Sequence, residues 1–230
     1  MNTRTFRRRR IGILAIVVLF VVAAIILSKD MYQPQATTPT ANATGSATKL
    51  LTSIPIKGRA PMTGYARTQF GDGWTETNGC DTRDIILHRD LKNPVVGTGC
   101  KVTSGILDDP YTGKIITFTR GVQSSSAVQI DHVVALGDAW QKGAQQLLKD
   151  RRVVLANDPL ELLAVDGPAN QQKSDGDAAT WLPPNKLFRC QYVARQIAVK
   201  AKYGLWMTQA EHDAIVRVLS GCPGQSLPTE

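Results

Sequence analysis

The chain has 230 residues, of which 43% are hydrophobic, and a formal net charge of +8. Residues 1–29 hold six of the 27 basic residues and none of the 19 acidic ones, which leaves 21 basic against 19 acidic residues, a net of +2, in the remainder. Because most of the net positive charge lies at the N-terminus, it indicates membrane topology and is not a sign of nucleic-acid binding. The length predicts one main domain with accessory segments.

The N-terminus is predicted to enter a membrane. A basic segment, residues 1–10, precedes residues 11–27, which carry no polar side chain. This apolar length just reaches that of a spanning helix and exceeds the usual core of a signal peptide, and no convincing cleavage site follows it. Residues 11–28 are therefore expected to be an uncleaved signal anchor, with a cleaved signal peptide as the alternative. Because arginines mark the cytoplasmic side, the protein is expected in the cell membrane as a single-pass protein with its domain outside the cell, or secreted if cleavage occurs.

The rest of the chain divides into a linker, a domain and a tail. Residues 29–52 are rich in Thr, Ala, Pro and Gln and poor in large apolar residues. Such a segment cannot bury a core and is predicted to be a flexible tether. Residues 53–222 are expected to form the folded domain, and residues 223–230 a C-terminal tail.

An accessory layer is expected between Leu50 and Asn93. The pattern from Thr82 to Leu91 predicts a short helix, and Ile115 to Phe118 is predicted to be a strand after further short strands. The aromatic residues expected to anchor the packing of the accessory layer are Tyr65, Phe70 and Trp74.

The second half of the chain is predicted to be mainly helical. Gly137 to Arg152 is expected to be mainly helical, and Phe188 to Tyr203 is predicted to be an amphipathic helix. Thr208 is expected to cap a final helix through Leu219, with Glu211 completing a Thr-x-x-Glu capping box. The residues of the first of these helices expected in the core are Trp140, Leu147 and Leu148.

The four cysteines are Cys80, Cys100, Cys190 and Cys222. They form no C-x-x-C pair, so the sequence does not indicate a zinc site. An even number of cysteines in an exported chain favours two disulfides. Of the three possible connectivities, 80–100 with 190–222 is preferred because it joins sequence neighbours within separate structural layers.

Outside the N-terminus, a nucleic-acid-binding surface would have to be a local group of basic residues. Ordinary solvated faces are the alternative for each candidate. The candidates are Lys149, Arg151, Arg152, Arg189, Arg195, Lys200 and Lys202.

The stretch from residue 129 to residue 173 holds the residues with the most specific chemistry. An apolar run carries Asp131 and His132 side by side, and a second apolar run follows at Leu162 to Val165. A turn and a helix start then bring in Asn170 and Lys173. The order strand, excursion, strand, helix brings an Asp, a His and an Asn to one point.

These residue types suit metal-assisted hydrolysis of a phosphodiester. Asp131 and Asn170 offer the hard oxygen ligands that Mg²⁺ or Mn²⁺ takes. His132 titrates near neutrality and can take a proton from water. Lys173 lies three residues after Asn170, on the same helical face, and could hold a phosphate oxygen. A capped histidine in a turn is the alternative for the Asp-His pair alone.

With these residues in view, the stretch resembles the HNH (ββα-metal, His-Me finger) nucleases, closely those with an Asp-His opening, as in the HNH domain of CRISPR effectors. The longer pattern is similar to exported bacterial HNH proteins related to the C-terminal domain of GmrSD restriction enzymes. The resemblance covers roughly residues 54–222 and implies an α+β fold in which a ββα-metal core carries accessory strands and helices. The segments that carry the resemblance are residues 131–136, 156–160, 170–175 and 181–184.

The resemblance assigns roles to individual residues. Asp131 takes the place of the first metal ligand, His132 that of the general base, and Asn170 that of the last ligand, where many HNH proteins have His. The family's middle Asn, which orients the loop around the base, corresponds to Glu161. A glutamate cannot donate an amide proton, and Asn157 is the nearby residue that could substitute.

The resemblance therefore implies an HNH-type endonuclease that hydrolyses nucleic acid, with DNA expected, using one Mg²⁺ or Mn²⁺ ion. Lys173 is expected to neutralise charge on phosphorus. Arg83, in a Cys-Asp-Thr-Arg run similar to that of exported relatives, is expected to reach the phosphate, with a salt bridge to a neighbouring acid as the alternative. Membrane contact is expected through residues 11–27, and no obligate protein partner is evident. The alternative function, supported by Glu161, is a catalytically inactive, nuclease-like binding module of the cell envelope.

Overall fold

The computed structural model describes residues 46–122 and 124–228, all within one compact unit of the chain. The predicted signal anchor, residues 11–28, lies outside the described residues, as does most of the predicted linker. In the part that is described, no helix has the length and apolar character needed to cross a membrane.

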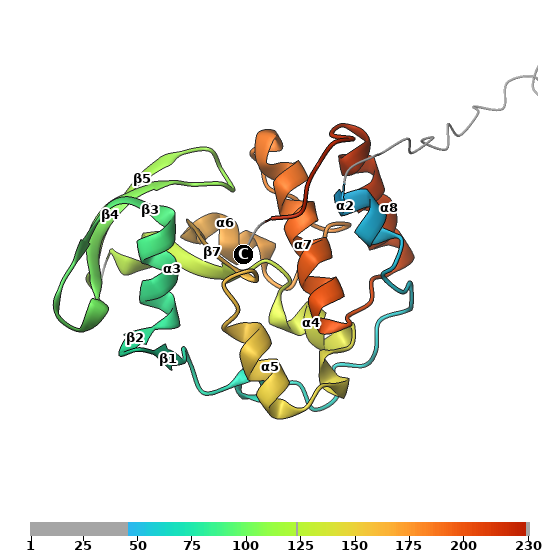
Figure 1. The fold of residues 1–230 in the computed structure, drawn as a ribbon, viewed down its shortest axis with the longest axis horizontal. Helices are drawn as coiled ribbons and strands as arrows, with labels where there is room; N and C mark the ends of the chain where they lie inside the picture. The colour runs from blue at the N-terminus through green and yellow to red at the C-terminus, as the bar shows by residue number, and fades with distance from the viewer. Residues whose placement is uncertain (1–45, 123, 229–230) are drawn as a thin grey trace, which may run out of the picture. The chain divides into compact units, whose positions relative to one another are not determined.

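The fold is α+β, as expected, with short antiparallel sheets set among helices (Figure 1). Two short strands, β1 and β2, pair with each other, and three longer strands form a sheet in the order β3-β4-β5. The strands are β1 (Glu76–Thr77), β2 (Cys80–Asp81), β3 (Leu91–Val96), β4 (Val102–Asp108), β5 (Ile115–Thr119), β6 (Val128–His132) and β7 (Leu162–Asp166). The helices are α2 (Ser46–Leu51), α3 (Thr82–Asp90), α4 (Leu136–Gln141), α5 (Lys149–Ala156), α6 (Gly167–Lys173), α7 (Arg189–Tyr203) and α8 (Gln209–Ser220).

A β-β-α unit lies at the centre of the described residues. Strands β6 and β7 form an antiparallel pair, in which His132 lies opposite Leu162, and α6 follows β7 without a gap. The sequence starts α6 sharply, because Asp166 accepts a hydrogen bond from the Ala169 amide at 2.8 Å and Pro168 occupies the first turn. The excursion between the two strands contains α4 and α5.

The two faces of this strand pair contribute to different cores. Side chains alternate along a strand. Val128 and Ile130 pack on one face with α3 and the β3–β5 sheet, while Leu163 and Val165 pack on the other face with α7 and α8. Asp131 and His132, as neighbours in β6, therefore point to opposite faces.

Both predicted disulfides are confirmed. Cys80 is bonded to Cys100, with their Cα atoms 5.3 Å apart, and Cys190 to Cys222, with their Cα atoms 6.4 Å apart. The first ties β2 to the loop between β3 and β4, and the second ties the start of α7 to the segment after α8. Each bond thus closes a loop within one part of the fold, as predicted.

The stretch Gly137–Arg152 is mainly helical, as expected, and its helical part is divided between α4 and α5. Helix α4 ends at Gln141, and Gly143 has a φ of 121°, a value that L side chains rarely adopt. A Cβ on Gly143 would lie 3.1 Å from the Trp206 ring, so the turn also depends on close packing. Trp140 is buried as predicted, but the prediction for Leu148 was wrong, because this side chain is 83% exposed at the start of α5.

A buried group of charges, called here the Lys142 cluster, joins distant segments. The Lys142 ammonium lies 2.6 Å from Asp138, 2.7 Å from Asp177 and 2.6 Å from Glu211, and Lys200 lies 3.0 Å from Glu211. Burial alone would lower the pKa of Lys200, but the nearby carboxylates, with Glu211 first, raise it. The complete cluster consists of Arg59, Asp138, Lys142, Asp177, Lys200 and Glu211.

The cluster corrects two predictions. Lys200 is completely buried, so it cannot belong to a nucleic-acid-binding surface, and the same holds for Arg152, which is 8% exposed. Thr208 caps α8 through the Glu211 amide, as predicted, but the Glu211 carboxylate faces the two buried lysines.

Candidate active site

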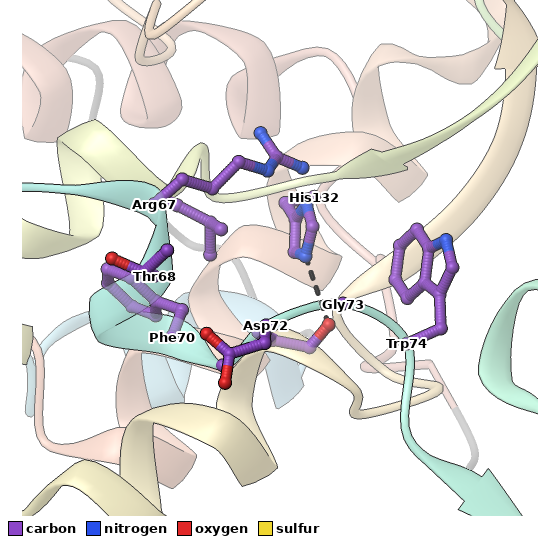
Figure 2. A pocket seen from close by; sticks show the side chains of 10 residues that line it. Arg67, Thr68, Phe70, Asp72, Gly73, Trp74 and His132 are labelled. Carbon is purple, nitrogen blue, oxygen red and sulfur yellow. Dashed lines mark hydrogen bonds between the residues drawn. The ribbon is translucent and has the colours of Figure 1, made fainter.

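His132 ends strand β6 and lines a pocket of about 310 Å³ (Figure 2). The residue is 6% exposed. One wall of the pocket comes from the segment before β1 and the other from the start of α4 and the end of α5. The residues that line it are Arg67, Thr68, Phe70, Gly71, Asp72, Gly73, Trp74, His132, Leu136 and Ala156.

Two neighbours fix the position of the His132 ring. Its Nε2 lies 3.0 Å from the Ala156 carbonyl oxygen, the contact dashed in Figure 2. Because a carbonyl oxygen only accepts, Nε2 must carry the proton, which leaves Nδ1 with a free lone pair. The Trp74 ring stacks on the imidazole, with centroids 5.7 Å apart and an angle of 11° between the planes. The ring is thus held in one tautomer and one orientation.

His132 is neutral over the whole physiological range. Burial lowers its pKa from 6.5 to about 3, and the positive charge of Arg67 adds to this effect. The hydrogen bond to Ala156 raises the pKa only in part. A neutral imidazole with a free Nδ1 is the state that a general base requires.

Asp131 lies on the opposite face of β6, with both carboxylate oxygens engaged. Oδ1 accepts a hydrogen bond from the Lys173 ammonium at 2.9 Å, and Oδ2 accepts one from the Tyr111 hydroxyl. Burial raises the pKa of Asp131, although Lys173 and the Tyr111 hydroxyl lower it. Burial also raises the pKa of Tyr111, with the charge of Asp131 as the next cause.

Asn170 contacts Gln129, the residue two positions before Asp131 and on the same face of β6. Its amide nitrogen donates to the Gln129 side-chain oxygen at 2.9 Å. The oxygens of Asp131 and Asn170 have the right chemistry for Mg²⁺ or Mn²⁺. This arrangement does not fit a bound ion, however, because the Lys173 ammonium and the Tyr111 hydroxyl already take both oxygens of Asp131. No group of three or more His, Cys, Asp or Glu side chains suited to a metal is found within residues 46–122 and 124–228.

Glu161 holds the backbone that follows the base. Its carbonyl oxygen accepts from the Val133 amide at 2.8 Å, and its carboxyl Oε2 accepts from the Val134 amide at 3.2 Å. The side chain is completely buried, and burial raises its pKa well above the usual range, which favours the neutral carboxyl. The carboxyl oxygen accepts from the Val134 amide as an amide oxygen could, so Glu161 holds the loop that follows the base.

Asn157 steadies a different segment. Its side-chain oxygen accepts from the Thr75 amide at 2.9 Å, and its side-chain nitrogen donates to the Val153 carbonyl at 3.0 Å. Thr75 directly follows Trp74, so Asn157 fixes the backbone beside the residue that stacks on His132. The two expected orienting residues therefore act on different segments, Glu161 on the backbone after His132 and Asn157 on the backbone after Trp74.

The structure places the two predicted phosphate contacts away from the His132 pocket. Lys173 is buried and donates to Asp131 and to the His132 carbonyl oxygen at 2.8 Å. Arg83 donates to the Val128 carbonyl oxygen at 3.4 Å. Neither lines the pocket, whereas Arg67 does. Sequence reasoning missed Arg67, which lies in the predicted accessory layer, and Tyr111, which lies just before the strand predicted from Ile115, because no motif surrounds either residue.

Comparison with known proteins establishes the family. The model of the family described as "GmrSD restriction endonucleases, C-terminal domain" matches residues 84–218, more than half of the chain. The chain belongs to the GmrSD C-terminal domain family. The resemblance to the C-terminal domain of GmrSD restriction enzymes is thereby confirmed, and the family's name links it to nucleases.

The GmrSD C-terminal match spans the whole β6-β7-α6 unit and begins just after Arg83. A relative described as an uncharacterized secreted protein of Arthroderma benhamiae is 35% identical over 191 residues, which cover 82% of this chain and 91% of the relative. Its description as secreted agrees with the two disulfides, which are typical of exported proteins. No solved structure matches the chain.

Proposed function

We propose that this GmrSD C-terminal domain protein hydrolyses phosphodiester bonds of nucleic acid, with DNA as the expected substrate and His132 as the general base. The observation that supports it most is the state of His132, a neutral ring held by the Ala156 carbonyl at the wall of a pocket. The pocket volume, about 310 Å³, is at the lower end of the range for ligand sites. The family assignment supports a nucleic acid as the ligand.

The proposed step is a displacement at phosphorus. Nδ1 of His132 takes a proton from a water molecule, and the water oxygen forms the new bond to phosphorus. The bond from phosphorus to the leaving 3′ oxygen breaks, and that oxygen takes a proton from solvent. The Nε2–H bond to Ala156 fixes the tautomer in which Nδ1 is the acceptor, and it stabilises the imidazolium that forms, since a carbonyl oxygen accepts more strongly from a cation. Trp74 prevents the ring from tilting.

A divalent ion at Asp131 and Asn170 remains a prediction from the resemblance. Asp131 is the anionic member of the pair, and Lys173 would have to leave its Oδ1 for an ion to bind there. In the absence of an ion, Lys173 neutralises Asp131 within the buried site. Arg83, bonded to the Val128 carbonyl, is proposed to support β6.

The test is cleavage of supercoiled plasmid and labelled oligonucleotides by the purified full chain, with Mg²⁺, with Mn²⁺ and with a chelator. His132→Gln is expected to lower the rate by about 10²–10⁴-fold, the usual worth of general base catalysis. His88→Gln, an exposed histidine outside the pocket, is the matched control and should cleave like the parent. Equal rates for the two variants would reject His132 as the base.

A second candidate is a nuclease-like binding module without hydrolytic activity. The engagement of both Asp131 oxygens by protein donors favours it. In that case the parent chain would bind oligonucleotides, and neither ion would produce cleavage.

A further inference from the structure

The His132 pocket holds one cation and one anion among the described residues that line it, Arg67 and Asp72. Both side chains are exposed. Across residues 46–122 and 124–228, the Arg67 guanidinium forms no ion pair and no hydrogen bond, although most arginines described here have a protein acceptor. Figure 2 shows its side chain beside His132, and the effect of its charge on that ring agrees with this placement.

The segment that carries Arg67 is firmly held. Arg67 begins a 3₁₀ turn, Arg67–Phe70. Phe70 is 2% exposed and packs edge-on against Trp140, with ring centroids 6.3 Å apart. Arg152 on α5 donates to the Gln69 carbonyl and to the Gln69 side chain, both at 2.9 Å. The backbone of Arg67 is therefore placed before any ligand arrives, which reduces the entropic cost of binding.

The far end of the same segment is fixed as well. Trp74 stacks on His132, and the Thr75 amide is bonded to Asn157. Residues 67–75 thus run along the pocket as a strap attached at both ends, with Arg67 at one end, Trp74 near the other, and both side chains beside the His132 ring.

We propose that Arg67 binds a non-bridging oxygen of the substrate phosphate while His132 activates the attacking water. This assignment rests on the proposed function, and it lies outside the residues matched by the family model, which begin at 84. A guanidinium can donate two parallel hydrogen bonds to a phosphate, which sets orientation as well as attraction. Lys173 and Arg83, the cations expected from the sequence to contact the phosphate, are committed to protein oxygens, whereas Arg67 lines the pocket.

The test uses full chains with Arg67→Met and Arg67→Lys, together with Arg217→Met as a control. Arg217 is exposed on α8 and does not line the pocket. The control substitution therefore removes the same charge at a site away from the pocket. Cleavage kinetics on a labelled DNA oligonucleotide should show a loss in kcat/KM of about 10–100-fold for Arg67→Met, the usual worth of a charged hydrogen bond. Arg67→Lys keeps the charge without the fork and should recover part of the loss.

Binding is measured separately by fluorescence anisotropy, in chains that also carry His132→Gln so that the DNA stays intact. The slope of log Kd against log salt should fall by about 0.7–0.9 for Arg67→Met, because one phosphate contact is lost, and it should stay unchanged for Arg217→Met. Asp72→Asn, which removes the pocket anion, should tighten binding.

Equal slopes for Arg67→Met and Arg217→Met, or no binding of DNA by the parent, would overturn the assignment. If the parent cleaves DNA and Arg67→Met cleaves equally well, the assignment fails while the proposed function stands. If the slope of log Kd against log salt falls for Arg67→Met but the parent cleaves nothing, Arg67 binds phosphate and the proposed hydrolytic function fails.

Discussion

Acid should destabilise this protein through His132. The pKa of the ring is lowered from 6.5 to about 3 in the folded protein, first because burial disfavours the imidazolium and then because Arg67 repels it. In the unfolded chain the ring has its ordinary pKa. Between these two values the unfolded state binds the extra proton, so the free energy of unfolding falls as the pH falls. The contribution of His132 to the free energy of unfolding is present above pH 6.5 and is lost progressively toward about pH 3.

The size of the effect follows from one proton. Each pH unit between the two pKa values removes about 1.4 kcal/mol from the free energy of unfolding. From pH 6.5 to about pH 4 the loss is about 3 kcal/mol, a large share of the roughly 5–15 kcal/mol that stabilises a typical domain.

The assay is urea unfolding of the full chain from about pH 7 to about pH 4. As the pH falls, the free energy of unfolding of the parent and of the His88→Gln control should decrease by about 1.4 kcal/mol per pH unit more than that of His132→Gln. The Gln amide of His132→Gln can still donate to the Ala156 carbonyl. Asp158 and Asp177, whose pKa values are lowered, add the same acid loss to every variant and cancel in the comparison. Parallel curves for parent and His132→Gln would show that the ring is not buried neutral.

Two further predictions concern the residues around the base. Lys173→Met removes one partner of a buried pair and should lower the free energy of unfolding by about 3–5 kcal/mol, measured against an exposed Lys149→Met control. It also frees Oδ1 of Asp131, so Mn²⁺ should bind about 10–100-fold more tightly by calorimetry; an unchanged affinity would remove Asp131 from the ligands. Burial raises the pKa of Glu161, so the parent loses stability as pH rises above about 4.5, by about 1.4 kcal/mol per unit, until that raised pKa is reached. Glu161→Gln should therefore be the more stable at pH 7 in thermal unfolding, with the difference shrinking toward pH 4.5, and a constant difference would contradict the neutral carboxyl.

The order of the central elements could be predicted from the sequence. Two apolar runs that bracket an excursion, followed by Asp166 and Pro168, specify a strand pair and a helix start through alternation and capping alone. The same alternation predicts that Asp131 and His132 separate to opposite faces. The cysteine pairs were also predictable, because each joins neighbours along the chain.

The partners of these residues could not be predicted, because they come from distant segments without a pattern of their own. Tyr111 lies in a turn twenty residues before Asp131, and nothing in that turn indicates a buried hydroxyl. Lys142 and Lys200 look like ordinary solvated lysines on their helices, and only the packing of five segments shows that both are buried among carboxylates.

The Lys142 cluster also sets a condition on how the protein can be shortened or assembled. Its members extend from Arg59 to Glu211, so the last of its carboxylates joins only when α8 is in place. A chain that ended before α8 would lack Glu211, so three cations would face the two remaining carboxylates of the cluster, although every residue of the His132 pocket would be present. The stability of the molecule that holds the pocket therefore depends on the C-terminal helix, and so on synthesis of the whole domain.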